Sequence, residues 1–418
     1  EYAQKHSNFY INDINYLSAS YGLERWSDPL YWYMYKYCLC TPAIPMLGNS
    51  ISNIIKSIYG KNKKALVLDL DNTLWDGIIG DDGVKGIEIG HDTSMGQAYS
   101  EFQSYIKQQK KIGVLLAINS KNDQENAIAG LNHPEGTLKP EDFLVIKANW
   151  NDKDTNIREI ATELNLLPDS FVFIDDNPAE RDIVYSNNPG IAVPEIEKIE
   201  NYINIIDKAG YFEVTSLSED DVNRNEMYKI NIERTKLKQK YSNYNDYLLS
   251  LDMIAQISDF DSIFIPRIAQ LTNKVNQFNL TTKRFSQSDI EDLSCDNSYI
   301  RLYGKLKDKF GDNGVSTIVI GKKDDQVLHI KLWLMSCRIM KRNMEHAMLD
   351  ALVQEALKYN IDTIRGYYYK TAKNGMVKDY YKTMGFKLIE QNGDDTVSEM
   401  EISNYQNLNH VINVVLAE

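Results

Sequence analysis

Residues 65–83 read ALVLDLDNTLWDGIIGDDG. The stretch begins with four apolar residues and passes directly into Asp69, Asp71 and Thr73. A short, continuous apolar run is typical of a strand that is buried on both faces of a parallel sheet. Carboxylates are costly to place beside such a core unless their charge is compensated. The stretch therefore predicts a buried strand that ends at a functional site.

Two further apolar runs, Val114–Ile118 and Phe171–Ile174, also end in polar residues. The sequence NSKN follows the first run at 119–122, and DDNP follows the second at 175–178. In an open parallel sheet, ligands bind beyond the carboxyl ends of the strands. If the three strands are neighbours, their polar ends meet at one site.

Helical patterns separate these strands. Apolar residues recur at helical spacing in two sets: Ala98, Phe102, Tyr105 and Ile106, and then Ile157, Ile160, Ala161 and Leu164. Gly113 follows the first set at a plausible helix C-terminus. Alternation of short apolar strands with amphipathic helices predicts an α/β fold with a parallel sheet covered on both faces.

Four aspartates are expected to converge at the strand ends: Asp69, Asp71, Asp175 and Asp176. Like charges repel unless a cation joins them, and Mg²⁺ prefers oxygen ligands, so we expect these four residues to hold Mg²⁺. If the chain bends after the first strand, Asp69 can attack phosphorus and form an aspartyl-phosphate. Asp71 can then protonate the leaving group and later deprotonate the attacking water.

Two more catalytic roles follow from a phosphoryl-transfer reaction. Ser120, at the end of the second strand, is expected to donate a hydrogen bond to a phosphoryl oxygen. A lysine is expected to offset the negative charge, and Lys153, just before the second helix, is the leading candidate. Lys121 is its rival.

These residues together resemble the motifs of the haloacid dehalogenase (HAD) superfamily of phosphatases and phosphotransferases. The matches are D-x-D-x-T at 69–73, Ser120, Lys153 and Asp175-Asp176. The resemblance implies a HAD-like, Rossmannoid sheet. Trp75–Gly90 suits a short flap, and Lys121–Ser170 leaves no room for a large cap domain. We therefore expect an open site that can admit a substrate carried on another protein.

Longer stretches of the sequence are similar to FkbH-like proteins. In the first half these stretches are LDLDNTLWDGIIGDDGVKGIEIG (68–90), LLAINSKND (115–123), NWNDKDTNI (149–157) and FVFIDDNPAERDIV (171–184). The similarity continues in RIAQLTNKVNQFNLTTKRF (267–285), FGDNGV (310–315) and LWLMSCR (332–338). The resemblance implies a Mg²⁺-dependent enzyme that dephosphorylates a substrate of the 1,3-bisphosphoglycerate type. It further implies transfer of the glyceryl group to the phosphopantetheine arm of an acyl carrier protein, in support of polyketide-type biosynthesis.

Length and composition set the wider limits. The 418 residues predict about two or three domains, and the formal net charge of −13 argues against a nucleic-acid or anionic-membrane partner. Four cysteines form neither a disulfide framework nor a pair of metal-type motifs. No apolar stretch approaches about 18 residues and no signal peptide is recognisable, so we expect a cytoplasmic protein.

Four segments are expected along the chain. Residues 1–60 are aromatic-rich and helical, and look like the tail of the SGNH-like domain that FkbH-like proteins often carry, without its nucleophile motif. Residues 61–195 form the HAD-like domain, and 196–250 a helical connector. Residues 251–418 form a second α/β domain.

The order of strand and helix signals across 299–390 resembles a GNAT-like acyltransferase fold. GNAT proteins bind the pyrophosphate of coenzyme A at a helix N-terminus through a glycine-containing loop. Lys341 and Asn343 stand at the glycine positions here, which argues against coenzyme A but not against a carrier's phosphopantetheine arm. Arg338, Arg342 and Tyr381 are the expected cofactor-binding residues. Tyr381 stands where many GNAT enzymes place a general acid; the alternative is a core tyrosine.

Cys337 is the candidate acyl carrier. It lies between a strand and a helix start, beside Arg338 and Arg342, and positive charge together with a helix N-terminus favours the thiolate. We hypothesise that it carries the glyceryl thioester; the alternative is a buried small residue. Many FkbH-like proteins have a cysteine before the serine of the second HAD motif, where this chain has Asn119.

Other interpretations stay open. The polar stretch 267–285 is either a surface for phosphate, glycerate or the pantetheine arm, or a hydrogen-bonded helix-to-strand corner. The whole chain is alternatively a simple HAD phosphatase acting on a small phosphorylated metabolite, or a non-catalytic docking module for a carrier protein.

Overall fold

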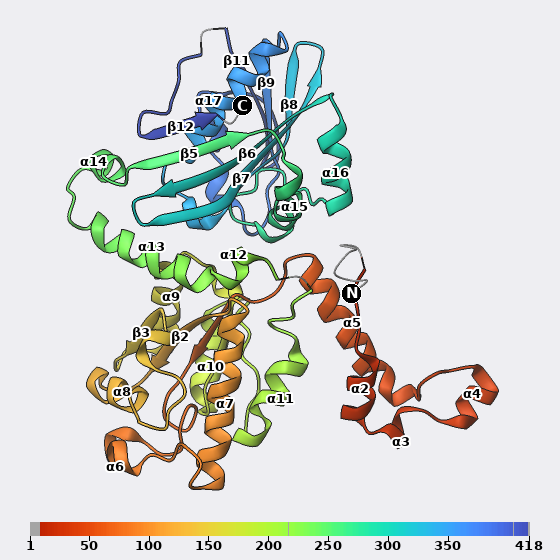
Figure 1. Ribbon diagram of the computed structural model, residues 1–418, viewed down its shortest axis with the longest axis vertical. Coiled ribbons are helices and arrows are strands. Elements are labelled where there is room, and N and C mark those ends of the chain that lie inside the picture. The colour runs from red at the N-terminus through yellow and green to blue at the C-terminus, as the bar shows by residue number, and fades with distance from the viewer. Residues whose placement is uncertain (1–8, 216, 404, 417–418) are drawn as a thin grey trace. The chain divides into compact units, whose positions relative to one another are not determined.

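The structure of the protein is a computed structural model that describes residues 9–215, 217–403 and 405–416 (Figure 1). The chain forms two compact units, Glu1–Asn225 and Glu226–Glu418. The boundary falls inside the stretch 196–250 that was expected as a connector. Helix α11 (Ile199–Ala209) buries Tyr202 and Ile206 in the core of the first unit, so the start of this stretch is part of that core.

The first unit contains a four-stranded parallel sheet with the order β3-β2-β1-β4. Its strands are β1 (Ala65–Leu68), β2 (Leu115–Ser120), β3 (Val145–Ala148) and β4 (Phe171–Ile174). Every residue of β1, β2 and β4 is buried, as a parallel sheet covered on both faces requires. The expected pairing of the three strands is confirmed, because β1 lies between β2 and β4.

Amphipathic helices cover this sheet. The helices of the sheet-bearing part are α6 (Ile79–Gly86), α7 (Ser94–Lys111), α8 (Gln124–Leu131), α9 (Lys153–Glu163), α10 (Pro178–Asn187), α11 and α12 (Glu219–Val222). Phe102 and Ile106 of α7 are fully buried, as their spacing predicts. Gly113, just after α7, has a φ of 91°, a conformation that favours glycine.

The segment Trp75–Gly90 is a short flap, as expected. Trp75 is buried and fixes the start of the flap. Asp76 and Glu88 exchange two backbone hydrogen bonds of 3.1 and 2.9 Å, which close the segment into a loop around α6. No large cap domain interrupts the described part of this unit.

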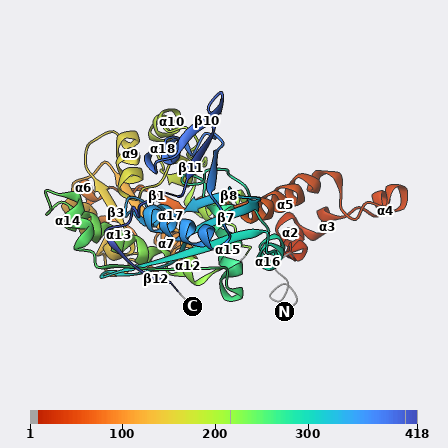
Figure 2. The ribbon, with the colours of Figure 1, turned by 90° about the horizontal axis from the view of Figure 1, so that it is seen from above.

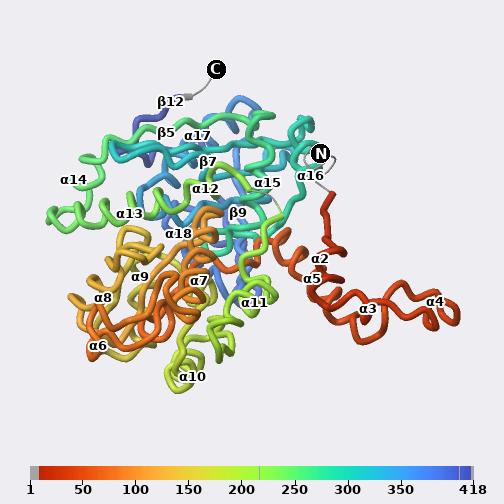
Figure 3. The backbone as a smooth tube through the Cα atoms, turned by 60° about the horizontal axis from the view of Figure 1, so that its bottom comes forward, coloured from red at the N-terminus to blue at the C-terminus, as the bar shows by residue number. Residues whose placement is uncertain are grey.

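Helices α2 (Ile14–Tyr21), α3 (Leu23–Trp26), α4 (Pro29–Tyr35) and α5 (Ile44–Ile58) follow one another in the first 60 residues (Figure 3). They share a small cluster of buried apolar residues, which contains Leu17, Trp26, Cys40 and Ala43. Helix α5 is tied to the rest of the unit by polar contacts: the Asn49 side chain donates to the carbonyl of Lys208 at 3.0 Å.

The second unit contains an eight-stranded mixed sheet with the order β10-β11-β9-β8-β7-β6-β5-β12. The strands are β5 (Met253–Ser258), β6 (Tyr299–Asp308), β7 (Gly311–Asp324), β8 (Val327–Met335), β9 (Thr363–Tyr368), β10 (Lys387–Asn392), β11 (Asp395–Glu401) and β12 (Ile412–Leu416). Only β8–β9 and β5–β12 pair in parallel; the other pairs are antiparallel.

The helices from the unit boundary onward are α13 (Arg224–Lys238), α14 (Tyr244–Leu249), α15 (Ile265–Lys274), α16 (Gln287–Cys295), α17 (Met344–Lys358) and α18 (Tyr380–Thr383). Helix α17, which is labelled in Figure 2, lies against β5 and β6 on one face, and α15 lies against β7 on the other. No helix in the described part of the chain is long and apolar enough to cross a membrane.

Strands β8 and β9 separate soon after they meet. They pair only from Val327–His329 to Thr363–Arg365. Beyond that point the segment Phe278–Thr281 lies between them. Its backbone exchanges hydrogen bonds of 2.9–3.0 Å with Trp333 and Met335 of β8 and with Tyr369 just after β9. We call this segment the wedge.

Candidate functional site

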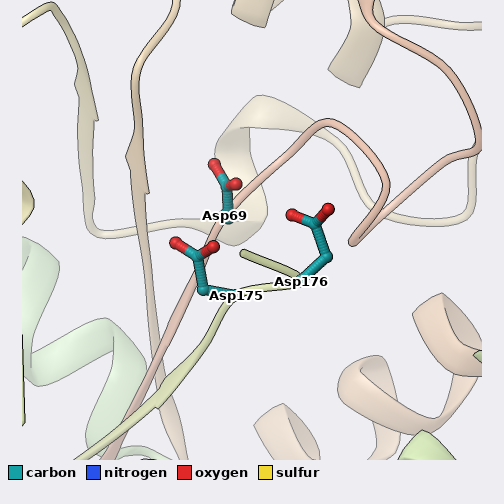
Figure 4. Close-up of side chains that lie close together, drawn as sticks. All are labelled: Asp69, Asp175 and Asp176. Carbon is teal, nitrogen blue, oxygen red and sulfur yellow. The ribbon is translucent and has the colours of Figure 1, made fainter. Parts of the chain in front are cut away.

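Three carboxylates meet at the carboxyl ends of β1 and β4 (Figure 4). One oxygen each of Asp69, Asp175 and Asp176 lies within 4.8 Å of the other two. The register of the sheet explains this: Leu68 pairs with Ile174, so Asp69 and Asp175 directly follow paired residues. The Asp69 N–H continues the ladder by donating to the carbonyl of Ile174 at 3.0 Å.

Lys153 is the lysine of this site. Its Nζ lies 3.0 Å from Asp69 Oδ2 and 2.5 Å from Asp175 Oδ2, and the side chain is 3% exposed. Burial opposes the charge, but Asp69 and Asp175 raise the pKa of Lys153 above its ordinary value. A lysine in the first turn of a helix is also disfavoured by the helix dipole, so the carboxylates must hold it there. The rival, Lys121, instead pairs with Glu180.

A single ammonium does not neutralise three clustered carboxylates. Asp69 Oδ1 is buried and has no hydrogen-bond partner among the described residues. Burial, and next the charge of Asp69, raises the pKa of Asp175 to about 7 and also raises the pKa of Asp176. Both observations indicate a shortage of positive charge. A hard divalent cation such as Mg²⁺ fits this donor set, and Asp69, Asp175 and Asp176 would hold it.

Asp71, the fourth expected ligand, is placed differently from the other three: its carboxylate lies outside the three-carboxylate cluster. Its Oδ1 accepts hydrogen bonds from Trp75 Nε1 and the Ile79 N–H at 2.9 and 3.1 Å, and its Oδ2 accepts from Asn122 Nδ2 at 2.9 Å. The chain turns after Leu70, and this turn directs Asp71 away from the metal ligands and toward the flap.

The environment of Asp71 suits a proton donor. Burial raises the pKa of Asp71 above its ordinary value, although the hydrogen bonds from Ile79 and Trp75 oppose that change. An acid must hold its proton near neutral pH in order to donate it, and a raised carboxyl pKa serves this end. The expected division of labour between Asp69 and Asp71 thus has a physical basis.

The end of β2 supplies the remaining expected residue. Ser120 is the last residue of β2 and is 2% exposed. Its neighbour Asn119 is fully buried and donates through Nδ2 to the carbonyl of Lys153 at 2.9 Å, while Asn156 Nδ2 donates to Asn119 Oδ1 at 3.0 Å. Asn119 therefore fixes the start of α9, and with it the position of Lys153.

Sequence reasoning missed three contributors to the site. Asn122 and Trp75 both donate to Asp71, and Arg181 donates to the backbone carbonyls of Asp175 and Asp176 at 2.8 Å each. Each lies within six residues of a recognised motif residue, and that proximity is the only signal the sequence offers.

In the second unit, Arg342 has a different task from the one expected. Its guanidinium is buried and donates to Asp308 Oδ2 at 3.1 Å and Asn231 Oδ1 at 2.8 Å. Arg234 donates to both oxygens of the same carboxylate at 2.7 Å. Burial, and next the charge of Arg234, lowers the pKa of Arg342 to about 10. Arg342 thus takes part in a buried ion pair, and its expected role in cofactor binding stays a prediction.

Arg338 and Cys337 lie in a short 3₁₀ turn, Cys337–Ile339, after β8. Arg338 is 8% exposed and its guanidinium contacts Ser336 Oγ and Met227 Sδ. Cys337 is half-buried, and its Sγ lies 3.7 Å from the hydroxyl of Tyr228. The structure therefore places the thiol beside a phenol.

Tyr381 is 3% exposed, and its ring lies so close to Gly366 that a methyl group there would overlap it. Burial raises the pKa of Tyr381 far above its ordinary value. The core-tyrosine interpretation describes this environment better than a solvent-facing acid does. Lys341 and Asn343, at the expected glycine positions, have φ values of 64° and 59°. The loop thus keeps a backbone that favours glycine while it carries two side chains.

The stretch 267–285 forms a hydrogen-bonded corner. Arg284 donates to the carbonyls of Asn273 and Val275 at 2.9 and 3.1 Å and so caps the end of α15. Burial lowers the pKa of Arg284. Asn273 Nδ2 donates to the Phe285 carbonyl at 2.9 Å. These contacts match the corner interpretation of the polar stretch.

Comparison with solved structures finds similarity to a chain that contains a phosphatase domain. The chain is similar to the N-terminal part of the protein BF1531 from Bacteroides fragilis, described as containing a phosphatase domain complexed with Mg. The identity is 39%, the TM-score is 0.50, and the match covers 52% of this chain and 58% of that chain. The matched region is thus less than two thirds of that chain's length.

Acetyltransferases also match, at low identity. The ribosomal-protein-S18-alanine N-acetyltransferase from Escherichia coli is 13% identical (38% of this chain, 99% of that chain, TM-score 0.28). Ard1 from Thermoplasma volcanium is 19% identical (35% and 97%, TM-score 0.27). No protein-family model and no curated protein matches the chain. The expected fold class is confirmed: an α/β chain with a HAD-like parallel sheet, no large cap and a second α/β unit whose element order is the GNAT-like one expected.

Mg²⁺ is expected to raise the melting temperature of the protein, because it binds the folded carboxylate cluster and not the unfolded chain. At a hundredfold excess over its dissociation constant, the gain is about 2.7 kcal/mol. Asp176→Asn should shift the Mg²⁺ titration to higher concentration, whereas Asp182→Asn, on the exposed side of α10, should leave it unchanged. Differential scanning calorimetry measures both. Equal titration curves for all three proteins would contradict this metal site.

Proposed function

We propose that the first unit is a Mg²⁺-dependent phosphatase that uses Asp69 as its nucleophile. One observation carries this proposal: Lys153 Nζ contacts both Asp69 and Asp175 within a cluster of three carboxylates. The 39% identity to a chain with a Mg-complexed phosphatase domain supports it. Lys153 holds Asp69 through Oδ2, while Asp69 Oδ1 has no hydrogen-bond partner among the described residues and can attack phosphorus.

The reaction follows from these positions. Asp69 attacks the phosphorus, a P–O bond to Asp69 forms, and the P–O bond to the leaving group breaks. Asp71 gives its proton to the leaving oxygen. Asp71 then takes a proton from water, the water attacks the aspartyl-phosphate, and Asp69 and inorganic phosphate are released. Ser120 and Lys153 bind the phosphoryl oxygens. Bound Mg²⁺ would supply further charge neutralisation at those oxygens.

We infer that the substrate is of the 1,3-bisphosphoglycerate type and that the glyceryl group passes to the phosphopantetheine arm of an acyl carrier protein, for polyketide-type biosynthesis. The resemblance to FkbH-like proteins, which extends over both units, supports this inference. The absence of a large cap in the described part of the first unit supports access by a bulky partner.

In the acyl-transfer step, Cys337 is the proposed carrier. Its thiolate attacks the acyl carbon of the acyl-phosphate, a C–S bond forms, the C–O bond breaks, and phosphate leaves. The carrier's pantetheine thiol then takes the acyl group and returns the thiolate. The half-buried thiol and the nearby Tyr228 hydroxyl support this role, since the phenol can donate a hydrogen bond to the thiolate.

Incubation with 1,3-bisphosphoglycerate and holo acyl carrier protein, followed by intact-mass spectrometry, tests the whole proposal. A glyceryl group on the carrier supports it. Release of phosphate without transfer reduces the function to that of a simple HAD phosphatase. Carrier binding without either reaction indicates a docking module.

Cys337→Ala is expected to remove the glyceryl adduct from the protein in that incubation. Phosphate release by the first unit should continue, because the Asp69 site does not depend on this thiol. Cys295→Ala, which removes an exposed cysteine of α16, is the matched control. An adduct that persists in Cys337→Ala would place the acyl group elsewhere.

A further inference from the structure

Three basic residues lie in the loops and first helical turns that follow the strands of the first sheet: Lys121, Lys153 and Arg181. Lys153 is bound by Asp69 and Asp175. Arg181 is bound by backbone carbonyls at the end of β4. Only Lys121 among the three is held by a residue outside the carboxylate cluster and its backbone.

Lys121 forms an ion pair with Glu180. Its Nζ lies 2.6 Å from Glu180 Oε1, and the side chains are 35% and 12% exposed. Lys121 directly follows Ser120, the proposed phosphate-binding residue, and Glu180 lies in the first turn of α10, four residues after Asp176. The pair therefore joins the two loops that flank the carboxylates.

Helix capping does not explain Glu180. A glutamate at the third position of a helix ordinarily accepts a hydrogen bond from the N-cap N–H. Here the N–H of the N-cap residue Asn177 donates instead to Asp175 Oδ1 at 2.9 Å. Glu180 Oε2 is buried and has no hydrogen-bond partner among the described residues. A buried carboxylate oxygen without a donor is costly, so it is a place where a ligand's donor gains free energy.

We propose that Lys121 and Glu180 recognise the part of the substrate that remains after the phosphate has left. Lys121 binds a second anionic group, a carboxylate or a second phosphate, and Glu180 Oε2 accepts a hydrogen bond from a neighbouring hydroxyl. The pair thus selects small, hydroxylated metabolites that carry two anionic groups. This inference rests on the proposed phosphatase function and assigns two specificity-determining residues to that site.

The position of the pair limits the size of the substrate. Consecutive residues lie about 3.3 Å apart along a strand, and a lysine side chain extends roughly twice that distance. A second anionic group that meets Lys121 is therefore a few bonds from a phosphate held by Ser120. Because a third of Lys121 is exposed, the substrate reaches it without opening the core.

The test compares two phosphate esters. Glycerate 3-phosphate carries a carboxylate and a hydroxyl beside its phosphate, whereas p-nitrophenyl phosphate carries the phosphate alone. Lys121→Met should lower kcat/KM for glycerate 3-phosphate by about tenfold or more, as loss of a charged hydrogen bond predicts, chiefly through KM. Turnover of p-nitrophenyl phosphate should change by less than about twofold.

A matched control separates recognition from simple loss of a lysine. Lys147→Met removes a lysine of β3 that pairs with Glu159 and Glu163 at 2.8 and 2.7 Å, and should leave both substrates unaffected. Glu180→Gln keeps the size of the side chain but releases Lys121, and should lower the preference for glycerate 3-phosphate. An equal change for both esters in Lys121→Met would overturn the proposal, because a purely structural ion pair acts on both.

A binding measurement keeps this result distinct from failure of the proposed function. If the wild-type protein cleaves neither ester, the phosphatase proposal fails. Isothermal titration of glycerate 3-phosphate into Asp69→Asn protein, with and without Lys121→Met, then still decides the recognition step. Weaker binding with Lys121→Met, by about tenfold or more, supports it; equal binding contradicts it.

Discussion

Asp69→Asn is expected to lower phosphatase turnover by about 10⁴-fold or more, because the amide cannot attack phosphorus and no other carboxylate stands in its place. Asparagine keeps the shape of the side chain, so the loss reports chemistry rather than packing. In the variant, Asp71 should keep the three hydrogen bonds that fix it toward the flap, and Asp175 should keep its ion pair with Lys153. Steady-state release of phosphate from p-nitrophenyl phosphate measures the effect.

The same substitution should leave the fold intact. Asp69 is one of the charges that raise the pKa of Asp175, so its removal relieves repulsion among the carboxylates. Without Mg²⁺, the melting temperature should fall by no more than about 4 °C. Asp81→Asn, on the exposed flap helix, is the matched control and should keep full activity. If Asp69→Asn retains a tenth of the wild-type rate, another residue is the nucleophile.

Asp308→Asn is expected to destabilise the second unit by about 3–5 kcal/mol, because it leaves two buried guanidinium groups without their counter-charge. The Asp308 carboxylate is fully buried and accepts from Arg234 and Arg342, and also from the N–H groups of Phe310 and Gly311 at 2.9 and 3.2 Å. Its loss removes charge from the centre of a five-bond network, and Arg342 stays protonated at neutral pH because its pKa is about 10.

Hydrogen–deuterium exchange measures whether the loss of stability is confined to the second unit. The amides of β6 and β7 should lose protection in Asp308→Asn, while those of β1 and β2 keep theirs. Glu233→Gln removes a carboxylate from an exposed pair with Lys236 on the same helix as Arg234, and should change stability by less than about 0.5 kcal/mol. Unchanged protection of β6 in Asp308→Asn would show that the network contributes little.

The phosphatase site could be predicted because its signals are local. Asp69, Ser120 and Asp175 each stand at or just after the end of an apolar strand, and parallel strands bring such ends together whatever the loops between them. The placement of Asp69 and Asp175 followed from this rule, whereas Lys153 was expected from its position just before a helix. The side-chain direction of Asp71 did not, because it depends on a turn and on three donors from the flap and the next loop.

Long-range partners were not predicted from the sequence. The ion pair of Arg342 could not be foreseen because Asp308 and Arg234, its neighbours in space, lie 34 and 108 positions away in the sequence. Strands β3, β5, β11 and β12 were missed as strands. Strand β11 is DTVSEME, with almost no apolar run, and only its pairing with β9 and β10 makes it a strand. The apolar pattern of a single segment does not predict pairing of that kind.

The wedge, Phe278–Thr281, affects how any extended molecule could bind to the second sheet. Where β8 and β9 part, their backbone groups would form an open edge inside the sheet, and such edges readily accept an added strand. The wedge already occupies those donors and acceptors at Trp333, Met335 and Tyr369. An extended molecule can therefore pair with these groups only by exchange, giving up bonds to solvent and taking over those of the wedge. The affinity for such a molecule is set by the difference in free energy between its hydrogen bonds to the strands and those of the wedge. Because the two sets of hydrogen bonds are similar, binding should be weak and readily reversible.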